Sequence, residues 1–167
     1  MSGFPTLKPW GTLLATISPP EHIGTLSSGG SQIIANITAT SLKTEPDVTP
    51  ALNATSVVFG GDWIHADPDG KHLRLDVRSV LRTDDGVPIT FIYTGIISVS
   101  PATALALSGA PEAQTVPFGD IVSVPRFVTG HDKYQHLENM VFVGSGRFVI
   151  TPGEPMKVEY KISEVLA

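Results

Sequence analysis

The segment His72–Gly95 reads HLRLDVRSVLRTDDGVPITFIYTG and determines most of the fold prediction. Aliphatic and charged residues alternate in its first half, where the charged positions are Arg74, Asp76 and Arg78. Alternation at period two is typical of a β-strand whose two faces have different surroundings. The charged face therefore either contacts bulk water or lines an internal cavity, and the function depends on which of these holds.

The turn after this strand contains an Asp-Gly pair, which is typical of a two-residue type I′ hairpin loop. With Asp85 and Gly86 as the loop, Arg78 is expected to lie opposite Tyr93 across the hairpin. Directly opposed side chains share a face of the sheet. The expected members of the first face are Arg74, Asp76, Arg78, Val80, Phe91 and Tyr93. The other face carries the aliphatic residues of Leu73–Leu81 and is expected to form core or interface. A three-residue loop would change this pairing.

The composition of the first face permits two interpretations. Charged groups interleaved with Phe, Tyr and Val are typical of a ligand cavity, which is apolar with a few convergent polar groups. Alternatively, the charged ladder lies on a wet face, where it contributes little beyond solubility. The residues alone leave both interpretations open.

The rest of the chain is divided into short segments by 16 Gly and 14 Pro. Segments rich in Val, Ile, Thr or aromatic residues and bounded by turn residues predict strands. These are Gly11–Ser18, Gln32–Thr40, Ser56–Phe59, His72–Thr83, Val87–Val99, Met140–Val143, Arg147–Thr151 and Met156–Val165. One short helix is expected at Thr103–Leu107, within a loop or lid that covers residues 99–118. The pattern predicts an antiparallel all-β sandwich or barrel.

Composition narrows the class of protein. A length of 167 residues fits a single domain, 1–167. The net charge is −5 and the 11 Lys and Arg are scattered, so we expect no nucleic-acid or membrane partner. The absence of cysteine excludes disulfides and thiolate chemistry. No apolar run approaches the roughly 18–20 residues that span a bilayer, and we expect a soluble, cytoplasmic protein.

An ordered series of short motifs resembles the domain-of-unknown-function 3237 family. The motifs are Gly60-Gly61-Asp62-Trp63, Pro68-Asp69-Gly70, Leu75-Asp76-Val77-Arg78, Thr83-Asp84-Asp85-Gly86, Tyr93-Thr94-Gly95, Pro125-Arg126-Phe127-Val128-Thr129-Gly130, Lys133-Tyr134 and Val141-Phe142-Val143-Gly144. The resemblance implies a single antiparallel β-barrel of about eight to ten strands, similar to calycins and allene oxide cyclase, with at most one short helix and a ligand-sized lumen. Some fungal members resemble cofactor-free cyclases, one of which closes an ether ring by adding a hydroxyl across an alkene.

The chain departs from the family pattern at two places. Where many members have Trp and Asn, this chain has the titratable residues His136 and Glu138. Where the family often has a Phe-Arg pair, it has Ile121 and Val122. These differences are consistent either with a pocket for a different ligand or with variation in an exposed loop.

The catalytic candidates are Asp62, Asp76, Arg78 and Tyr93. Asp76, between two arginines, is expected to have a lowered pKa and to act as a base or orienting group. Tyr93, opposite Arg78, is expected to donate a proton or a hydrogen bond. Asp62, next to Trp63, becomes an acid if desolvation raises its pKa. The candidates for substrate binding are Trp63, His65, Arg74, Phe91 and His136.

Each candidate also has a purely structural interpretation. Asp62 could cap the turn after two glycines, Trp63 could belong to the core, and His65 and His136 could lie at the surface. The five histidines lack HxH or HExxH spacing, so no metal site is expected. No cofactor-binding motif is present either, because the glycine pairs lack a phosphate-binding frame.

The leading hypothesis is a cofactor-independent cyclase or isomerase of specialised metabolism. It would close a ring in an apolar polyketide or terpenoid by general acid/base catalysis inside the barrel. The alternatives are a non-catalytic, lipocalin-like carrier of small molecules and a structural module that dimerises through the Leu73–Leu81 face. A homodimer is compatible with all three hypotheses.

Overall fold

The computed structural model describes residues 3–167, and within them ten strands form one sheet. The strands are β1 (Thr6–Ile17), β2 (Glu21–Thr25), β3 (Ser31–Thr44), β4 (Asn53–Ser56), β5 (Gly60–Ala66), β6 (His72–Thr83), β7 (Pro88–Ser98), β8 (Ile121–Val128), β9 (Phe142–Val149) and β10 (Lys157–Leu166). The helices are α1 (Pro101–Leu107) and the short 3-10 helix η1 (Gln135–Asn139).

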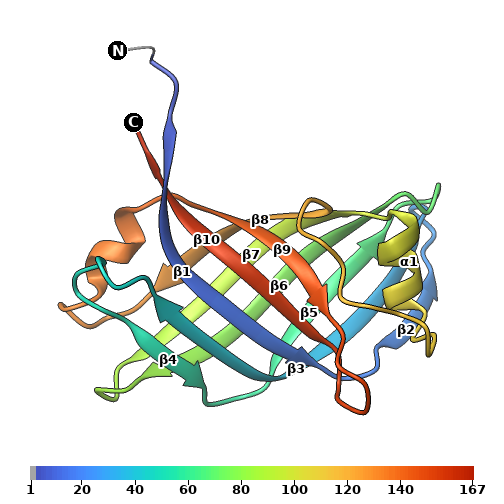
Figure 1. Cartoon of the computed structure of the whole chain (residues 1–167), viewed down its shortest axis with the longest axis horizontal. Helices are drawn as coiled ribbons and strands as arrows, with labels where there is room; N and C mark the ends of the chain where they lie inside the picture. The colour runs from blue at the N-terminus through green and yellow to red at the C-terminus, as the bar shows by residue number, and fades with distance from the viewer. Residues whose placement is uncertain (1–2) are drawn as a thin grey trace.

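The sheet closes into an antiparallel barrel (Figure 1). Within the described residues the ring has eight strands in the order β1-β10-β9-β8-β7-β6-β5-β3, and β3 pairs back with β1. Two further strands extend it: β4 lies between β3 and β6 at one end, and β2 pairs with β3 at the other. The predicted all-β antiparallel barrel with one short α-helix is confirmed.

The β6–β7 hairpin has a loop of three residues, so the predicted two-residue loop is wrong. The loop is Asp84–Gly86, and the amide of Thr83 donates to the carbonyl of Val87 at 3.0 Å. The loop's last residue is a glycine with φ of 88°, the left-handed conformation that such three-residue loops require. The extra residue shifts the pairing by one position, and Tyr93 lies opposite Val77.

This shift changes which β7 residues share a face with which β6 residues, so Phe91 and Tyr93 lie on the face of Val77 and Ser79 instead of that of Arg78. The aliphatic residues of Leu73–Leu81 point into the barrel, together with Tyr93. The side chains of Arg74, Asp76 and Arg78 lie on the outer wall and are 55%, 50% and 65% exposed. The prediction that the charged ladder lines a cavity is therefore wrong, and so is the prediction that the aliphatic face pairs with a second copy.

Other strand boundaries also differ from the prediction. Residues 57–59, inside the predicted strand Ser56–Phe59, are the exposed break between β4 and β5. The two predicted strands Met140–Val143 and Arg147–Thr151 form one continuous strand, β9, which runs through Gly144–Gly146. Strands β2, β5 and β8 were not predicted. The helix predicted at Thr103–Leu107 is confirmed as α1.

Aromatic rings fill one end of the barrel. The ring of Trp10 lies 5.0 Å from that of Phe127 and 4.9 Å from that of Phe142, and Phe91 lies 5.2 Å from Phe127. Tyr93 continues this stack toward the middle, 5.5 Å from Phe91. Helix α1 and strand β2 lie at the opposite end (Figure 1).

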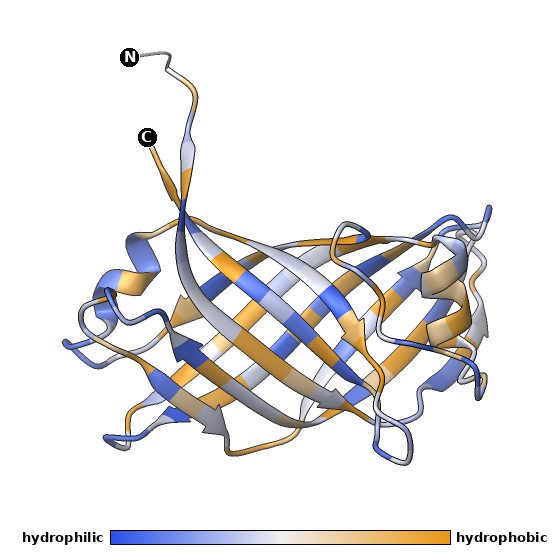
Figure 2. Cartoon of the chain, in the orientation of Figure 1, coloured by the Kyte–Doolittle hydropathy of each residue, from blue (hydrophilic) through white to orange (hydrophobic). Residues whose placement is uncertain are grey.

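The strands alternate between apolar and polar residues, as half-buried strands should (Figure 2). Within the described part of the chain, none of the helices is long and apolar enough to span a membrane.

Candidate functional site

A cavity of about 350 Å³ occupies the half of the barrel that faces α1. Its wall is formed by side chains from strands around the ring and by Ala104 and Leu107 of α1. Most of the lining is aliphatic. Among the described residues, the titratable side chains that line it are those of His22, Asp62, Tyr93 and Tyr160. The cavity thus has the form of a ligand site, apolar with few polar groups.

Asp62 projects from β5 into this cavity and is 8% exposed. The β5–β6 register runs from Asp62 opposite Val77 to His65 opposite Arg74 and skips the residues between them. At this gap, Oδ1 of Asp62 accepts the backbone N–H of Asp76 at 3.1 Å. The carboxyl group therefore takes the place of a backbone acceptor that the β5–β6 ladder lacks at this point.

Burial raises the pKa of Asp62 from 3.8 to about 7. The hydrogen bond from the amide of Asp76 opposes this rise, and the negative charge of the Asp76 side chain adds to it. A carboxyl group with a pKa near 7 exchanges protons readily at neutral pH. The expected effect of burial on the pKa of Asp62 is present, and its role as an acid stays a prediction; its interpretation as a turn cap is wrong, because Asp62 lies inside β5.

Two tyrosines face the same cavity. Tyr93 from β7 and Tyr160 from β10 meet edge to face, with ring centroids 5.1 Å apart and planes inclined at 61°. Burial is the largest cause that raises the pKa of each hydroxyl, and the charge of Asp62 raises both further. A hydrogen bond with Tyr160 also raises the pKa of Tyr93. Both groups are therefore neutral hydrogen-bond donors at physiological pH.

Glycines in β9 make room for the ring of Tyr160. A Cβ atom on Gly146 would lie 2.6 Å from Cε1 of Tyr160, closer than packed carbon atoms approach. A Cβ atom on Gly144 would lie 2.5 Å from Oγ of Ser123. The predicted strands Met140–Val143 and Arg147–Thr151 stop on either side of these glycines, and the predicted site residues do not include Tyr160. The period-two burial of Val158, Tyr160 and Ile162 was the signal that could have located it.

The structure places three of the predicted site residues on the outer wall. Arg74 forms a two-pronged ion pair with Asp67, with both N···O distances 2.8 Å. Nε of Arg78 lies 3.9 Å from Oδ1 of Asp76. These side chains form the solvated ladder of the second interpretation and do not reach the cavity, so their predicted contact with a ligand in the barrel is wrong.

The remaining predicted residues also lie away from the cavity. Trp63 is 48% exposed on the outside, where its ring lies over Gly61, and His65 follows on the same outward face. Phe91 points inward but is buried in the aromatic stack, and His136 is exposed on η1. Of the predicted set, the structure brings together only Asp62 and Tyr93.

One group of side chains has ligand spacing for a metal ion among the described residues. Ligand atoms of Asp67, Asp69 and His72 lie within 4.8 Å of one another. The guanidinium of Arg74, however, donates to both carboxylate oxygens of Asp67 and lowers its pKa. Because the strongest ligand of the group already has a cationic partner, these residues fit a surface ion pair better than a metal site.

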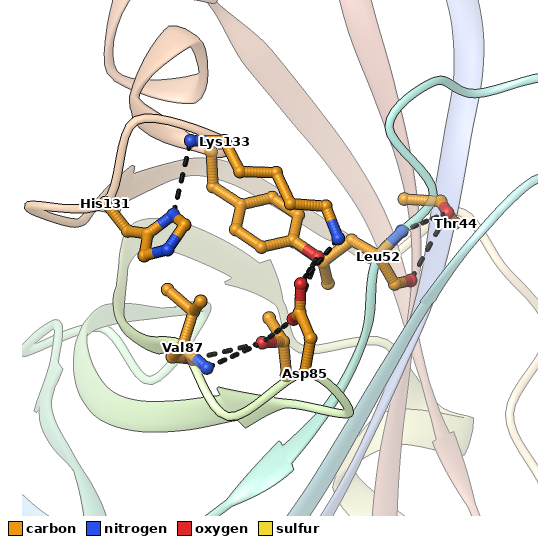
Figure 3. Close-up of polar contacts among 8 residues, drawn as sticks. Thr44, Leu52, Asp85, Val87, His131 and Lys133 are labelled. Carbon is orange, nitrogen blue, oxygen red and sulfur yellow. Dashed lines mark hydrogen bonds and ion pairs between the residues drawn. The ribbon is translucent and has the colours of Figure 1, made fainter.

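The motifs Thr83-Asp84-Asp85-Gly86 and Lys133-Tyr134 meet at the end of the barrel opposite α1, and Figure 3 shows their contacts. Nζ of Lys133 lies 2.5 Å from Oδ2 of Asp85, and the hydroxyl of Tyr134 donates to the same carboxylate at 3.2 Å. The Lys133 hydrogen bond is the main cause that lowers the pKa of Asp85. These contacts connect the β6–β7 loop to the segment before η1, so the motifs around Thr83 and Lys133 have a structural role.

Comparison with known proteins agrees with this architecture. A solved protein of unknown function from Rhodopseudomonas palustris is 23% identical, with a TM-score of 0.78 over 99% of this chain and 100% of that one. A β-barrel-like protein from Acinetobacter baumannii is also 23% identical, with a TM-score of 0.74 over 99% and 98%. An enzyme from Penicillium herquei is 17% identical, with a TM-score of 0.62 over 96% and 94%.

These similarities show the fold. No curated protein matches the chain. A family model described as protein of unknown function, DUF3237, matches residues 5–165. The chain belongs to the DUF3237 family.

Proposed function

We propose that the protein is a cofactor-independent cyclase or isomerase that acts on an apolar small molecule inside the barrel. The observation that carries this proposal is a single buried carboxyl group with a pKa of about 7, next to two neutral tyrosine hydroxyls in an otherwise apolar cavity. A carrier can use such a group only as a hydrogen-bond partner, whereas a carboxyl group with a pKa near the operating pH is suited to acid/base catalysis. The enzyme from Penicillium herquei supports the proposal through its similar fold.

The site can perform an intramolecular addition of a hydroxyl to an alkene with no external reagent. Protonated Asp62 transfers its proton to one alkene carbon, and the substrate's own hydroxyl oxygen forms the C–O bond at the other. The hydroxyl proton then returns to the Asp62 carboxylate, so the enzyme ends in its starting state. The same carboxyl group can move a proton between two carbons, which is an isomerisation.

The tyrosines orient and polarise the substrate. The hydroxyl of Tyr93 donates to the oxygen of Tyr160, so the O–H of Tyr160 can donate a hydrogen bond to a substrate carbonyl or hydroxyl next to Asp62. The aliphatic wall excludes water, which strengthens these interactions and protects a cationic intermediate from hydrolysis. Holding hydroxyl and alkene together supplies several kcal/mol of a unimolecular barrier. A small catalytic set is therefore sufficient.

Asp62→Asn tests the proposal, with Asp132→Asn as the matched control at an exposed position that does not line the cavity. Both variants are incubated with a panel of neutral hydroxy-alkenes, and the products are resolved by chiral chromatography with mass detection. We expect Asp62→Asn to lose at least about 100-fold in rate, the usual contribution of a general acid. Asp132→Asn should keep most of the wild-type rate. Unchanged conversion by Asp62→Asn would refute the mechanism, and binding without turnover by the wild type would favour the carrier.

A further inference from the structure

The cavity continues into a second space at the end of the barrel that carries α1. This groove has a volume of about 940 Å³ and lies between the end of α1 and the turn that precedes β10. The residues that line both spaces are Ile17, Ser18, Pro20, His22, Leu107 and Met156. The shared lining shows that the groove is an outward continuation of the cavity, beginning at the end of the barrel opposite the aromatic stack.

Helix α1 forms a fixed side of this passage. The hydroxyls of Ser100 and Thr103 both donate to Oδ2 of Asp120, at 2.5 and 2.6 Å. Thr103 is fully buried, so the first turn of the helix is tied to the start of β8. Leu107, at the last position of the helix, is thereby held at the junction of cavity and groove.

Among the described residues, neither space offers a lysine or arginine side chain to an anion, and the one imidazole that lines both, His22, is an exposed residue of β2 at their junction. The acidic residue of the groove, Glu154, is paired with Lys157 at 2.6 Å. At the inner end of the cavity an anion would instead meet the Asp62 carboxyl. Transferring an unpaired carboxylate or phosphate into such surroundings is costly.

We propose that the ligand is an uncharged, elongated molecule that is longer than the cavity. Its polar, hydroxyl-bearing end lies against Asp62 and its apolar tail passes Leu107 and Met156 into the groove. Only the chemistry assigned to the inner end rests on the proposed function. Because a phosphate-bearing carrier meets no Lys or Arg among the described residues of either lining, the substrate arrives free, and the preceding reaction must be of the class that releases a product from its thioester or phosphate carrier.

Displacement of the neutral dye N-phenyl-1-naphthylamine by 1-alkanols tests this proposal. Each additional buried methylene should raise the affinity about fourfold. We expect the rise to continue beyond the chain length that fills the cavity, until the groove is also full. Fatty acids of the same lengths at pH 8 should bind at least tenfold more weakly. A plateau at the length of the cavity, or equal binding of acids and alcohols, would overturn the proposal.

Leu107→Trp narrows the junction, and Leu105→Trp is its matched control on the same helix. Both leucines are similarly exposed, at 39% and 37%, but Leu105 lines neither space. In Leu107→Trp the ratio of hexadecanol affinity to octanol affinity should fall at least tenfold. The octanol affinity itself should change less than threefold, which also shows that the variant folds. Equal losses for both alcohols, or the same loss in Leu105→Trp, would contradict the assigned path.

The two proposals fail separately. The displacement assay measures binding alone and requires no turnover. If the alkanol series behaves as described but Asp62→Asn leaves catalysis unchanged, the extended binding site stands and the acid/base mechanism fails. If turnover depends on Asp62 but affinity stops rising at the cavity length, the mechanism stands and the groove has no role in binding.

Discussion

Asp62→Asn is expected to stabilise the protein above pH 7 even though it removes the proposed acid. The pKa of Asp62 is about 7 in the folded state, against 3.8 for an ordinary aspartate. Between these values the folded chain holds a proton that the unfolded chain releases. The stability contribution that is fully present below pH 3.8 is therefore lost as the pH rises through 7. A shift of about three pH units corresponds to about 4 kcal/mol.

Asn at this position avoids the loss because it carries no charge at any pH. Its side-chain oxygen can still accept the amide of Asp76, so the hydrogen bond within the β5–β6 gap is kept. The difference in free energy of unfolding between the variant and the wild type should therefore be smallest near pH 4. It should grow in favour of the variant toward pH 8, with about 4 kcal/mol as its upper value.

Urea denaturation at intervals from pH 4 to pH 8 measures this difference directly. Asp132→Asn is the control, because it removes an exposed carboxylate that does not contribute to the pKa shift of Asp62. Its difference from the wild type should stay nearly constant over the same range. If the Asp62→Asn difference is also independent of pH, then Asp62 titrates as an ordinary carboxyl group and the argument from burial is wrong.

Two further predictions concern the packing around the site. Gly146→Ala should destabilise the protein by about 1–3 kcal/mol in thermal or urea unfolding, because its Cβ atom would lie 2.6 Å from the Tyr160 ring. Ser145→Ala changes an exposed position beside it and should have little effect. Equal effects of the two substitutions would contradict the packing argument. Asp120→Ala should accelerate amide hydrogen exchange in α1 because both hydroxyls that fix the helix lose their acceptor; unchanged exchange there, relative to Glu112→Ala, would show that the helix is held otherwise.

The periodicity of the sequence predicted the long strands β1, β3, β6, β7 and β10 but missed β2, β5 and β8, and it did not determine which face points inward. The alternation in His72–Thr83 identifies β6 correctly, and Gly86 correctly marks a turn. A loop with one additional residue nevertheless places each β7 side chain on the opposite β6 face from the one predicted, because the side-chain period of a strand is two. Tyr93 was assigned to the right cavity with the wrong neighbours: its own position is inside, and Arg78 is outside.

The sequence could predict only part of the candidate site, because some of its residues come together only in the closed barrel. Asp62 could be identified from its neighbours in sequence, since a carboxyl group beside Trp63 in a strand segment suggests desolvation. Tyr160 could not be placed next to Tyr93, because β7 and β10 are separated by two intervening strands and come together only when the barrel closes. The glycines that accommodate Tyr160 also obscured the strand that carries them.

The outer ladder and the inner acid are nevertheless physically connected through one residue. The backbone amide of Asp76 holds the Asp62 carboxyl from within the barrel wall, while the side chain of Asp76 lies on its outer surface. Its negative charge opposes ionisation of Asp62 and so adds to the effect of burial. Arg74 is occupied by Asp67, which leaves this repulsion largely uncompensated from that side. The charged strand that first suggested a cavity thus tunes the acid from outside it and does not contact the ligand.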